Sequence, residues 1–415
     1  MKLFCLEIKR LLKTRSTRIL LIAAVVCALL TAYLPMTFLT ITAFDEAGNQ
    51  KKLRGADALQ YAKELQSEIS GVITPQRARA AVDAYQACLR EYGVQYDYEL
   101  PDDAYTLRIV PVSPLVRRIR EAFADPDTGM VPDALELDPE EVEGFYAACV
   151  SRLNALMLME QEDHPSAQKA AAKMYSQVSM PFVFKTGCST NVMDYQEILM
   201  YLVLLLCSVI AAPVFSSEYQ TGADSILRCA RHGRVYLGVV KVAAALTVCI
   251  SAFALCTAFY IAVSRALFGT ACLDTSLQML YSVSSLPALT VGEFQIRLAA
   301  LGCLTLLSAV SLTLLFSARL HSGAASMALS MFFCILPVVV YMLAPDGVSA
   351  WLLSLLPASG VSLQASYLYA MTGFEFLHAG SMSVFLPIAM AAFSALEIPI
   401  FCGSAVRAYV RHHIS

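Results

Sequence analysis

The sequence is poor in charge. Only 15% of its 415 residues are charged, whereas 57% are hydrophobic. This composition is too apolar for one soluble core, and the apolar residues gather in runs long enough to cross a bilayer. The chain is therefore predicted to be an integral membrane protein, with the lipid bilayer as its first partner.

Common catalytic and metal-binding motifs are also absent. No glycine is followed by lysine, so there is no phosphate-binding loop of the G-x-x-x-x-G-K-[ST] type and no ATPase site in the chain itself. Neither H-E-x-x-H, G-x-S-x-G nor C-x-x-C occurs, and the six histidines are scattered. We expect no catalytic residue, no metal site, no cofactor and no nucleic-acid partner, so the chain is not predicted to be an enzyme.

The charges that are present are unevenly distributed. Residues 45–197 hold 15 Lys and Arg against 25 Asp and Glu, a net charge of −10, while the remainder of the chain carries +7. Basic residues favour the cytoplasmic side of a membrane. The asymmetry predicts an acidic extracellular domain and basic cytoplasmic edges, with both termini cytoplasmic.

Six apolar runs are predicted to span the membrane in an all-α polytopic fold. They cover residues 19–44, 198–215, 235–263, 298–317, 322–343 and 384–406. Residues 1–18 precede them as a basic amphipathic helix, and 407–415 form a cytoplasmic tail. Lys241, near the start of the third run, is predicted to extend toward the cytoplasmic headgroups.

Residues 45–197 are predicted to form a mainly helical extracellular domain. Thr74-Pro75 and Gly93 are typical start and stop signals of one helix. Ser113-Pro114 and Asp138-Pro139 each predict the start of another, whereas residues 105–110 have the pattern of a short strand.

Two further extracellular features follow from the sequence. Residues 344–382 form a predicted loop, in which a short apolar run around Trp351 favours a re-entrant or interfacial helix. Four cysteines fall on this side of the membrane, and their spacing selects no disulfide pair. They are Cys88, Cys149, Cys188 and Cys272.

The most distinctive motif lies in residues 216–234, the connection between the second and third runs. It contains Ser217-Glu218-Tyr219-Gln220-Thr221-Gly222 and ends in Arg231-His232-Gly233-Arg234. Between these segments a short surface helix is predicted over residues 223–229, with Ile226 and Leu227 on one side and Arg228 on the other. Basicity alone would also suit a simple anchor that only fixes the orientation.

This motif resembles the loop of ABC-2-type transporter permeases, which carry Ser-Glu-Tyr-x-x-Gly, a short helix and a basic cluster with glycine. The N-terminal helix resembles the elbow helix of that family, and the six-span layout with a large insert after the first span adds to the likeness. The resemblance implies the membrane subunit of an exporter in the cell membrane. Its implied partners are a separate ABC ATPase subunit and a second permease subunit, identical or different.

The resemblance further implies a coupling helix that docks on the ATPase. The residues assigned to that interface are Glu218, Tyr219, Gly222, Arg228, Arg231, Gly233 and Arg234. Charge reversal at Arg228 and Arg231 is expected to abolish transport and ATPase association. Relatives with a large insert move peptides, antimicrobial amphiphiles or ions, which defines the implied class of cargo.

Glu397 is the one acidic residue that the sequence predicts deep within a span. It is a candidate for the translocation path, or else a protonated packing residue. Two alternative functions stay open. A secondary transporter would show internal repeats and broken helices with charges at the midplane. In a membrane-tethered sensor or binding protein, the acidic domain would carry the activity and the spans would be anchors.

Overall fold

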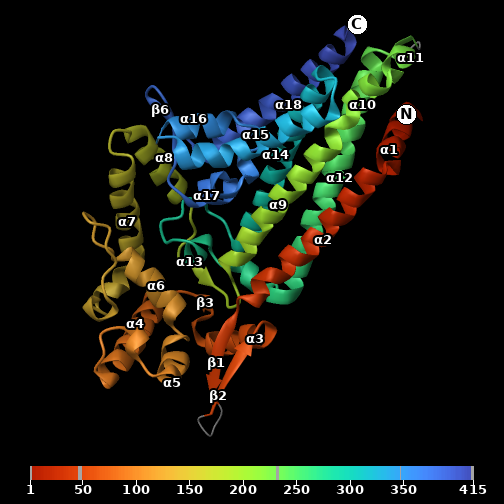
Figure 1. Cartoon of the computed structure of the whole chain (residues 1–415). Coiled ribbons are helices and arrows are strands. Elements are labelled where there is room, and N and C mark those ends of the chain that lie inside the picture. Colours follow the sequence, from red (N-terminus) through yellow and green to blue (C-terminus); the bar gives the residue numbers. More distant parts are fainter. Residues whose placement is uncertain (1, 45–48, 230–232, 346, 413–415) are drawn as a thin grey trace.

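Six long helices form a bundle, and a smaller domain inserted after the first of them lies at one end (Figure 1). The computed structural model describes residues 2–44, 49–229, 233–345 and 347–412. The helices long and apolar enough to cross a membrane are α2 (Arg15–Thr37), α9 (Thr190–Ala211) continued by α10 (Pro213–Thr221), α12 (Val235–Phe268), α14 (Val291–Arg319), α15 (Gly323–Leu343) and α18 (Leu386–Arg411). The predicted class, a mostly helical multi-pass membrane protein, is confirmed at this level.

The first two spans differ from their predicted limits. The first helix ends at Thr37 rather than at residue 44, because β1 (Thr40–Phe44) pairs with β2 (Gln50–Arg54) as an antiparallel ribbon. The second begins at Thr190 rather than at residue 198, so that Asp194 and Glu197 belong to a bundle helix. Before the first span, α1 (Lys2–Lys13) forms the predicted N-terminal helix and packs against α12.

The remaining helices are short and build the inserted domain and the loops that join it. They are α3 (Ala56–Leu65), α4 (Pro75–Tyr92), α5 (Asp102–Ala104), α6 (Ser113–Ala122), α7 (Phe145–Glu160), α8 (Pro165–Tyr175), α13 (Leu277–Leu280), α16 (Val348–Leu355) and α17 (Tyr367–Thr372). Two small antiparallel ribbons complete the described fold. They are β3 (Gly71–Val72) with β4 (Val183–Phe184), and β5 (Phe376–Ala379) with β6 (Met382–Phe385).

Local signals set some of these boundaries correctly. The Thr74 hydroxyl accepts a hydrogen bond of 3.3 Å from the amide of Arg77 at the start of α4, and Gly93 ends the helix at φ 65°. The predicted strand over residues 105–110 was wrong, since Tyr105–Ile109 forms a helical turn continuing from α5. The helix expected from Asp138-Pro139 begins only at Phe145, after a short turn at Glu141–Gly144.

The inserted domain has its own hydrophobic core, and later parts of the chain complete it. Met279, Val283 and Leu286 from the connection before α14 are buried in it, as are Phe376 and Phe385 from the β5–β6 ribbon. The predicted loop 344–382 and the connection before α14 are therefore partly domain structure. Hydrogen bonds join them to the domain: the Arg118 Nε donates to the Met279 carbonyl at 3.2 Å, and the Tyr175 hydroxyl donates to the Val283 carbonyl at 2.6 Å.

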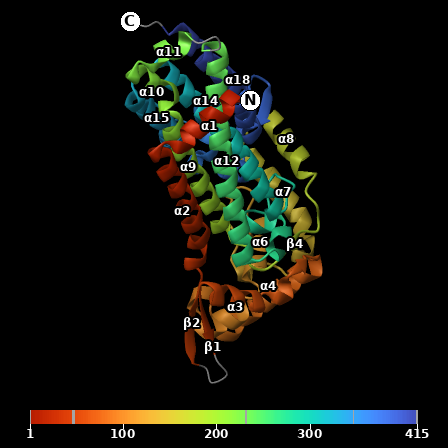
Figure 2. The same ribbon diagram turned by 90° about the vertical axis from the view of Figure 1, so that its right-hand side faces the viewer.

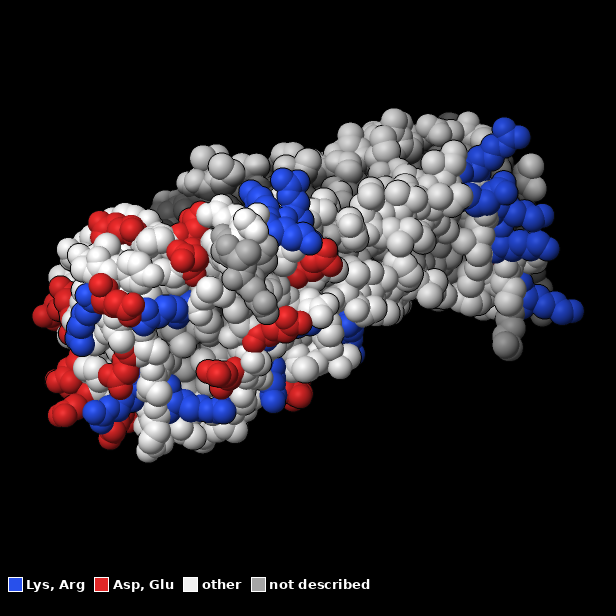
Figure 3. Space-filling model, turned by 90° about the horizontal axis from the view of Figure 1, so that it is seen from below, with Lys and Arg blue, Asp and Glu red and all other residues white. Residues whose placement is uncertain are grey.

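Both termini and the short helix α11 (Ala223–Cys229) lie at the end of the bundle away from the β1–β2 ribbon, here called the motif end (Figures 1 and 2). Charge follows the same axis. In Figure 3 the acidic side chains gather over the inserted domain, the opposite end shows only Lys and Arg, and a broad uncharged surface lies between them. That uncharged belt is what a bilayer core requires of the residues facing it.

Candidate functional site

The motif residues 216–221 form part of a helix and not an open loop. Pro213 starts α10, and the hydroxyl of Ser317 in α14 accepts hydrogen bonds from the amides of Phe215 at 3.0 Å and Ser216 at 3.2 Å. Gly222 ends the helix in the left-handed conformation at φ 68°, which favours glycine. The predicted short helix then follows as α11, so this part of the chain forms a sharp helical corner.

Glu218 lies at the centre of a buried network of charges. Its Oε1 accepts hydrogen bonds from the Arg10 guanidinium of α1 and from the Lys241 ammonium of α12. Arg10 also pairs with Glu7 at 2.9 Å, and the Lys241 Nζ lies 4.0 Å from the Glu7 Oε2. Glu218 is only 4% exposed and Lys241 1% exposed. Two acidic and two basic side chains therefore balance one another where three helices meet.

Removing these groups from water is costly, and their mutual attraction offsets that cost only while every partner is present. The network consequently fixes α1, α10 and α12 relative to one another. The structure also places the side chains of Lys241 and Glu218 differently from what the sequence led us to expect. The Lys241 side chain is enclosed in the bundle and does not extend to the surface, and the Glu218 side chain faces the protein interior.

A second cluster joins the motif to the end of α18. The ring of Tyr219 stacks on His412 with centroids 3.9 Å apart, and its hydroxyl donates to the Ala318 carbonyl at 3.2 Å. The His412 Nε2 lies 3.0 Å from the His321 Nε2, and its Nδ1 lies 3.5 Å from Asp224 in α11. The motif therefore contacts the α14–α15 turn and α18 as well as α1 and α12.

The outer surface of the corner is formed by a different set of residues. Ile226 is 77% exposed, whereas Leu227 packs against the bundle core, so the prediction that the two share one side was wrong. Gly233 is buried and its carbonyl accepts a hydrogen bond of 3.2 Å from the Tyr409 hydroxyl; Arg234 is exposed just before α12. Arg228 is described only by its backbone in α11, and Arg231 lies outside the described residues.

Besides Glu218, two acidic residues of the spanning helices are of interest for transport, Glu197 and Glu397. Glu397 of α18, the predicted path residue, accepts a hydrogen bond from the Ser308 hydroxyl of α14. Glu197 of α9 is more enclosed, at 2% exposed, and its carboxyl group lies beside the Ser366 hydroxyl. The sequence missed Glu197 because the apolar run begins only at residue 198. Its signal was its spacing from Met193 and Met200, which places it on the buried face of α9.

The structure brings together one pair of the four cysteines predicted to be extracellular. The Cys188 Sγ donates to the Cys272 carbonyl at 2.9 Å, while Cys88 and Cys149 are buried in the core of the inserted domain. All four are free thiols. Among the described residues no group of three or more His, Cys, Asp or Glu is arranged to hold a metal ion.

Neither a family model nor a curated protein matches this chain. The motif, its geometry and the arrangement of the spans are the features of the chain that bear on its function.

Proposed function

We propose that this protein is the membrane subunit of an ABC-2-type exporter, and that residues 216–234 dock on a separate ATPase subunit. The observation that carries the proposal is the buried network at Glu218. Because it ties the surface corner α10–α11 to α1 and α12, a displacement of the corner would move whole helices. Converting ATP-driven motion into movement of the spans requires such a rigid connection.

The proposal divides the motif residues into two groups. Glu218, Tyr219 and Gly233 face inward and hold the corner. The contact surface is formed by exposed residues, with Ile226 as its most exposed apolar side chain. Gly222 supplies the turn, and Arg228, Arg231 and Arg234 would add positive charge suited to an acidic patch on the ATPase.

The orientation and the assembly belong to the same proposal. The motif end, with both termini, faces the cytoplasm, and the inserted domain lies outside the cell membrane. Two permease subunits assemble with two ATPase subunits, and the cargo is a peptide, an antimicrobial amphiphile or an ion. The basic motif end and the acidic inserted domain support this orientation.

The test is detergent co-purification with the ATPase subunit, identified by mass spectrometry and by its nucleotide hydrolysis. Ile226→Asp places a charge on the exposed corner and is expected to reduce the recovered ATPase at least about tenfold, since an apolar contact becomes a buried charge. Met130→Asp is the matched control, because Met130 is 73% exposed on the inserted domain. Equal ATPase recovery from both variants would contradict docking at this corner.

One observation favours a second candidate, a cation-coupled secondary transporter. Glu197 and Glu397 are carboxyl groups inside the spanning helices, where such groups commonly mark ion or proton pathways. Proteoliposomes containing only this chain separate the two functions. Cargo uptake driven by a pH gradient, without ATPase or nucleotide and lost in Glu197→Gln, would favour the secondary transporter.

A further inference from the structure

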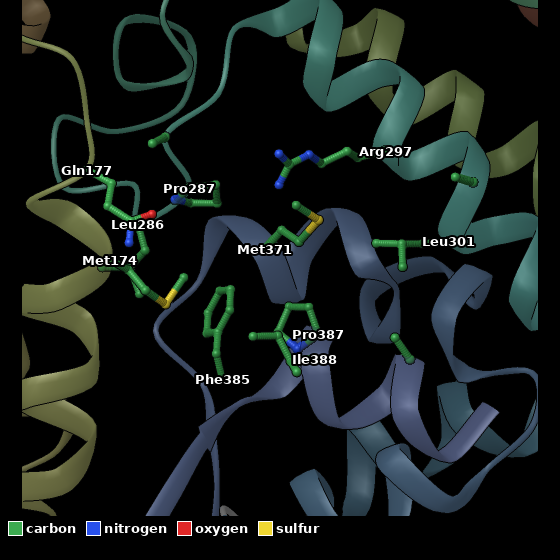
Figure 4. A pocket seen from close by; sticks show the side chains of 13 residues that line it. Met174, Gln177, Leu286, Pro287, Arg297, Leu301, Met371, Phe385, Pro387 and Ile388 are labelled. Carbon is green, nitrogen blue, oxygen red and sulfur yellow. The ribbon is translucent and has the colours of Figure 1, made fainter. Parts of the chain in front are cut away.

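A cavity of about 490 Å³ lies where the inserted domain meets the spanning helices (Figure 4). Its walls come from the ends of α8 and α17, the connection before α14, and the first turns of α14 and α18. The lining residues are Met174, Gln177, Leu286, Pro287, Ala288, Arg297, Ala300, Leu301, Met371, Phe385, Pro387, Ile388 and Ala391. Its volume is in the range of pockets that bind small organic molecules.

The cavity lining is apolar except at two positions. Gln177 lies on the α8 side and Arg297 on the α14 side, and Figure 4 shows the Arg297 guanidinium extending across the opening toward Pro287 and Met371. No acidic residue lines the cavity. Within the described part of the chain, no ion pair or hydrogen bond engages the Arg297 side chain. A single unpaired cation beside an apolar cavity suits a ligand with one anionic group and a hydrocarbon portion.

The position of the opening identifies where such a ligand comes from. Arg297 lies in the second turn of α14, near the end of a membrane-spanning helix. Ile296 beside it is 55% exposed, and Ile388 on the adjoining end of α18 is 58% exposed. Exposed isoleucines on two spanning helices suit contact with hydrocarbon, and an arginine near a helix end suits contact with headgroups. The cavity is therefore accessible from within one leaflet.

We infer that this cavity binds an anionic glycerophospholipid from the leaflet on the side of the inserted domain. Its phosphate-bearing headgroup pairs with Arg297, and one acyl chain occupies the space between Met371, Leu301 and Ala391. Basic side chains at the ends of spanning helices recognise lipid headgroups in this way. Because both the domain and the bundle line the cavity, a bound lipid would contact both at once. The inference does not depend on the proposed transport function.

Native mass spectrometry of the detergent-purified protein tests the site with phosphatidylglycerol and phosphatidylcholine of identical acyl chains. The wild type is expected to retain one phosphatidylglycerol in preference to phosphatidylcholine. Arg297→Gln removes the charge-assisted contact and should weaken phosphatidylglycerol binding about tenfold. Arg297→Lys keeps the positive charge and should retain most of the preference.

Two further variants distinguish the cavity from general attraction of anionic lipid. Arg265→Gln removes an arginine at the end of another spanning helix, which lines a different cavity, and should leave binding unchanged. Ala391→Trp fills the cavity and should reduce binding of both lipids. Equal retention of the two lipids by the wild type, or unchanged binding in both Arg297→Gln and Ala391→Trp, would overturn the inference. Arg297-dependent recovery of a peptide in place of lipid would overturn it as well.

Discussion

One ion pair of the inserted domain and one at the motif end of the bundle lie in opposite environments. In the domain, Arg79 pairs with Glu143 at 2.9 Å while both side chains remain about half exposed. At the motif end, Lys241 and Glu218 pair where water is excluded. Exposed pairs contribute little to stability, whereas a buried pair becomes a liability once one partner is lost. The comparison predicts that the Lys241–Glu218 pair matters for stability and that the Arg79–Glu143 pair does not.

The largest expected difference between the inserted domain and the motif end is in the reactivity of their cysteine thiols. Cys5 and Cys229 are exposed at the motif end, whereas Cys149 is buried in the inserted domain. Burial raises the pKa of the Cys149 thiol, so little thiolate forms at neutral pH. A membrane-impermeant maleimide should therefore label Cys229 in the native protein, and Cys149 only after denaturation.

The same reagent tests the proposed orientation. Cys229 should react in inverted membrane vesicles and stay unlabelled in intact cells, with Cys229→Ser identifying its share of the signal. Rapid labelling of Cys229 from outside intact cells would refute a cytoplasmic motif end, and with it the proposed ATPase contact.

The next largest effect is expected at the buried network. Among the described residues, Lys241→Met leaves Glu218 and Glu7 with Arg10 as their only paired cation, and it should destabilise the protein by about 3 kcal/mol. Adding Glu218→Gln restores neutrality, because Arg10 and Glu7 still pair, and should recover most of that loss. Denaturant titration in detergent measures both variants. A double variant as unstable as the single one would show that burial of charge is not what destabilises Lys241→Met.

The smallest effect is expected for the exposed pair. Arg79→Met removes the contact with Glu143, yet water solvates the remaining carboxylate, so the unfolding midpoint should not change measurably. Denaturant titration in detergent measures the unfolding midpoint of Arg79→Met for comparison with that of Lys241→Met. A large loss of stability here would remove the proposed distinction between the two ends.

The sequence predicted those features that depend on short-range signals. Thr74 and Gly93 mark the beginning and end of α4, and the six apolar runs predict the six spanning helices, because length and hydropathy suffice for that inference. The motif was likewise recognised from its own residues, through their resemblance to a known loop. The role of Glu218 inside the bundle was not predicted, because Arg10 and Glu218 are 208 positions apart and no periodicity reveals that they meet.

Other misjudged elements also depend on tertiary context. Residues 40–44 are apolar enough to extend a span, but pairing with residues 50–54 makes them a strand. Tyr105–Ile109 has strand-forming residues and is nevertheless helical, as a continuation of α5. Glu197 looked external because it is charged, yet its carboxyl group is enclosed by neighbouring helices. The first two cases are decided by neighbouring segments of the chain, and only Glu197 by helices distant in the sequence.

The core of the inserted domain has a consequence for biosynthesis. Translation delivers residues 49–189 long before Met279, Leu286, Phe376 and Phe385, which fill that core. A nascent chain therefore displays an unfinished apolar surface on the domain while ribosomes are still producing α12, α14 and α15. Maturation of the domain is consequently a late event, completed only when the final hairpin before α18 has been made, and truncated chains would be natural targets for quality-control proteases.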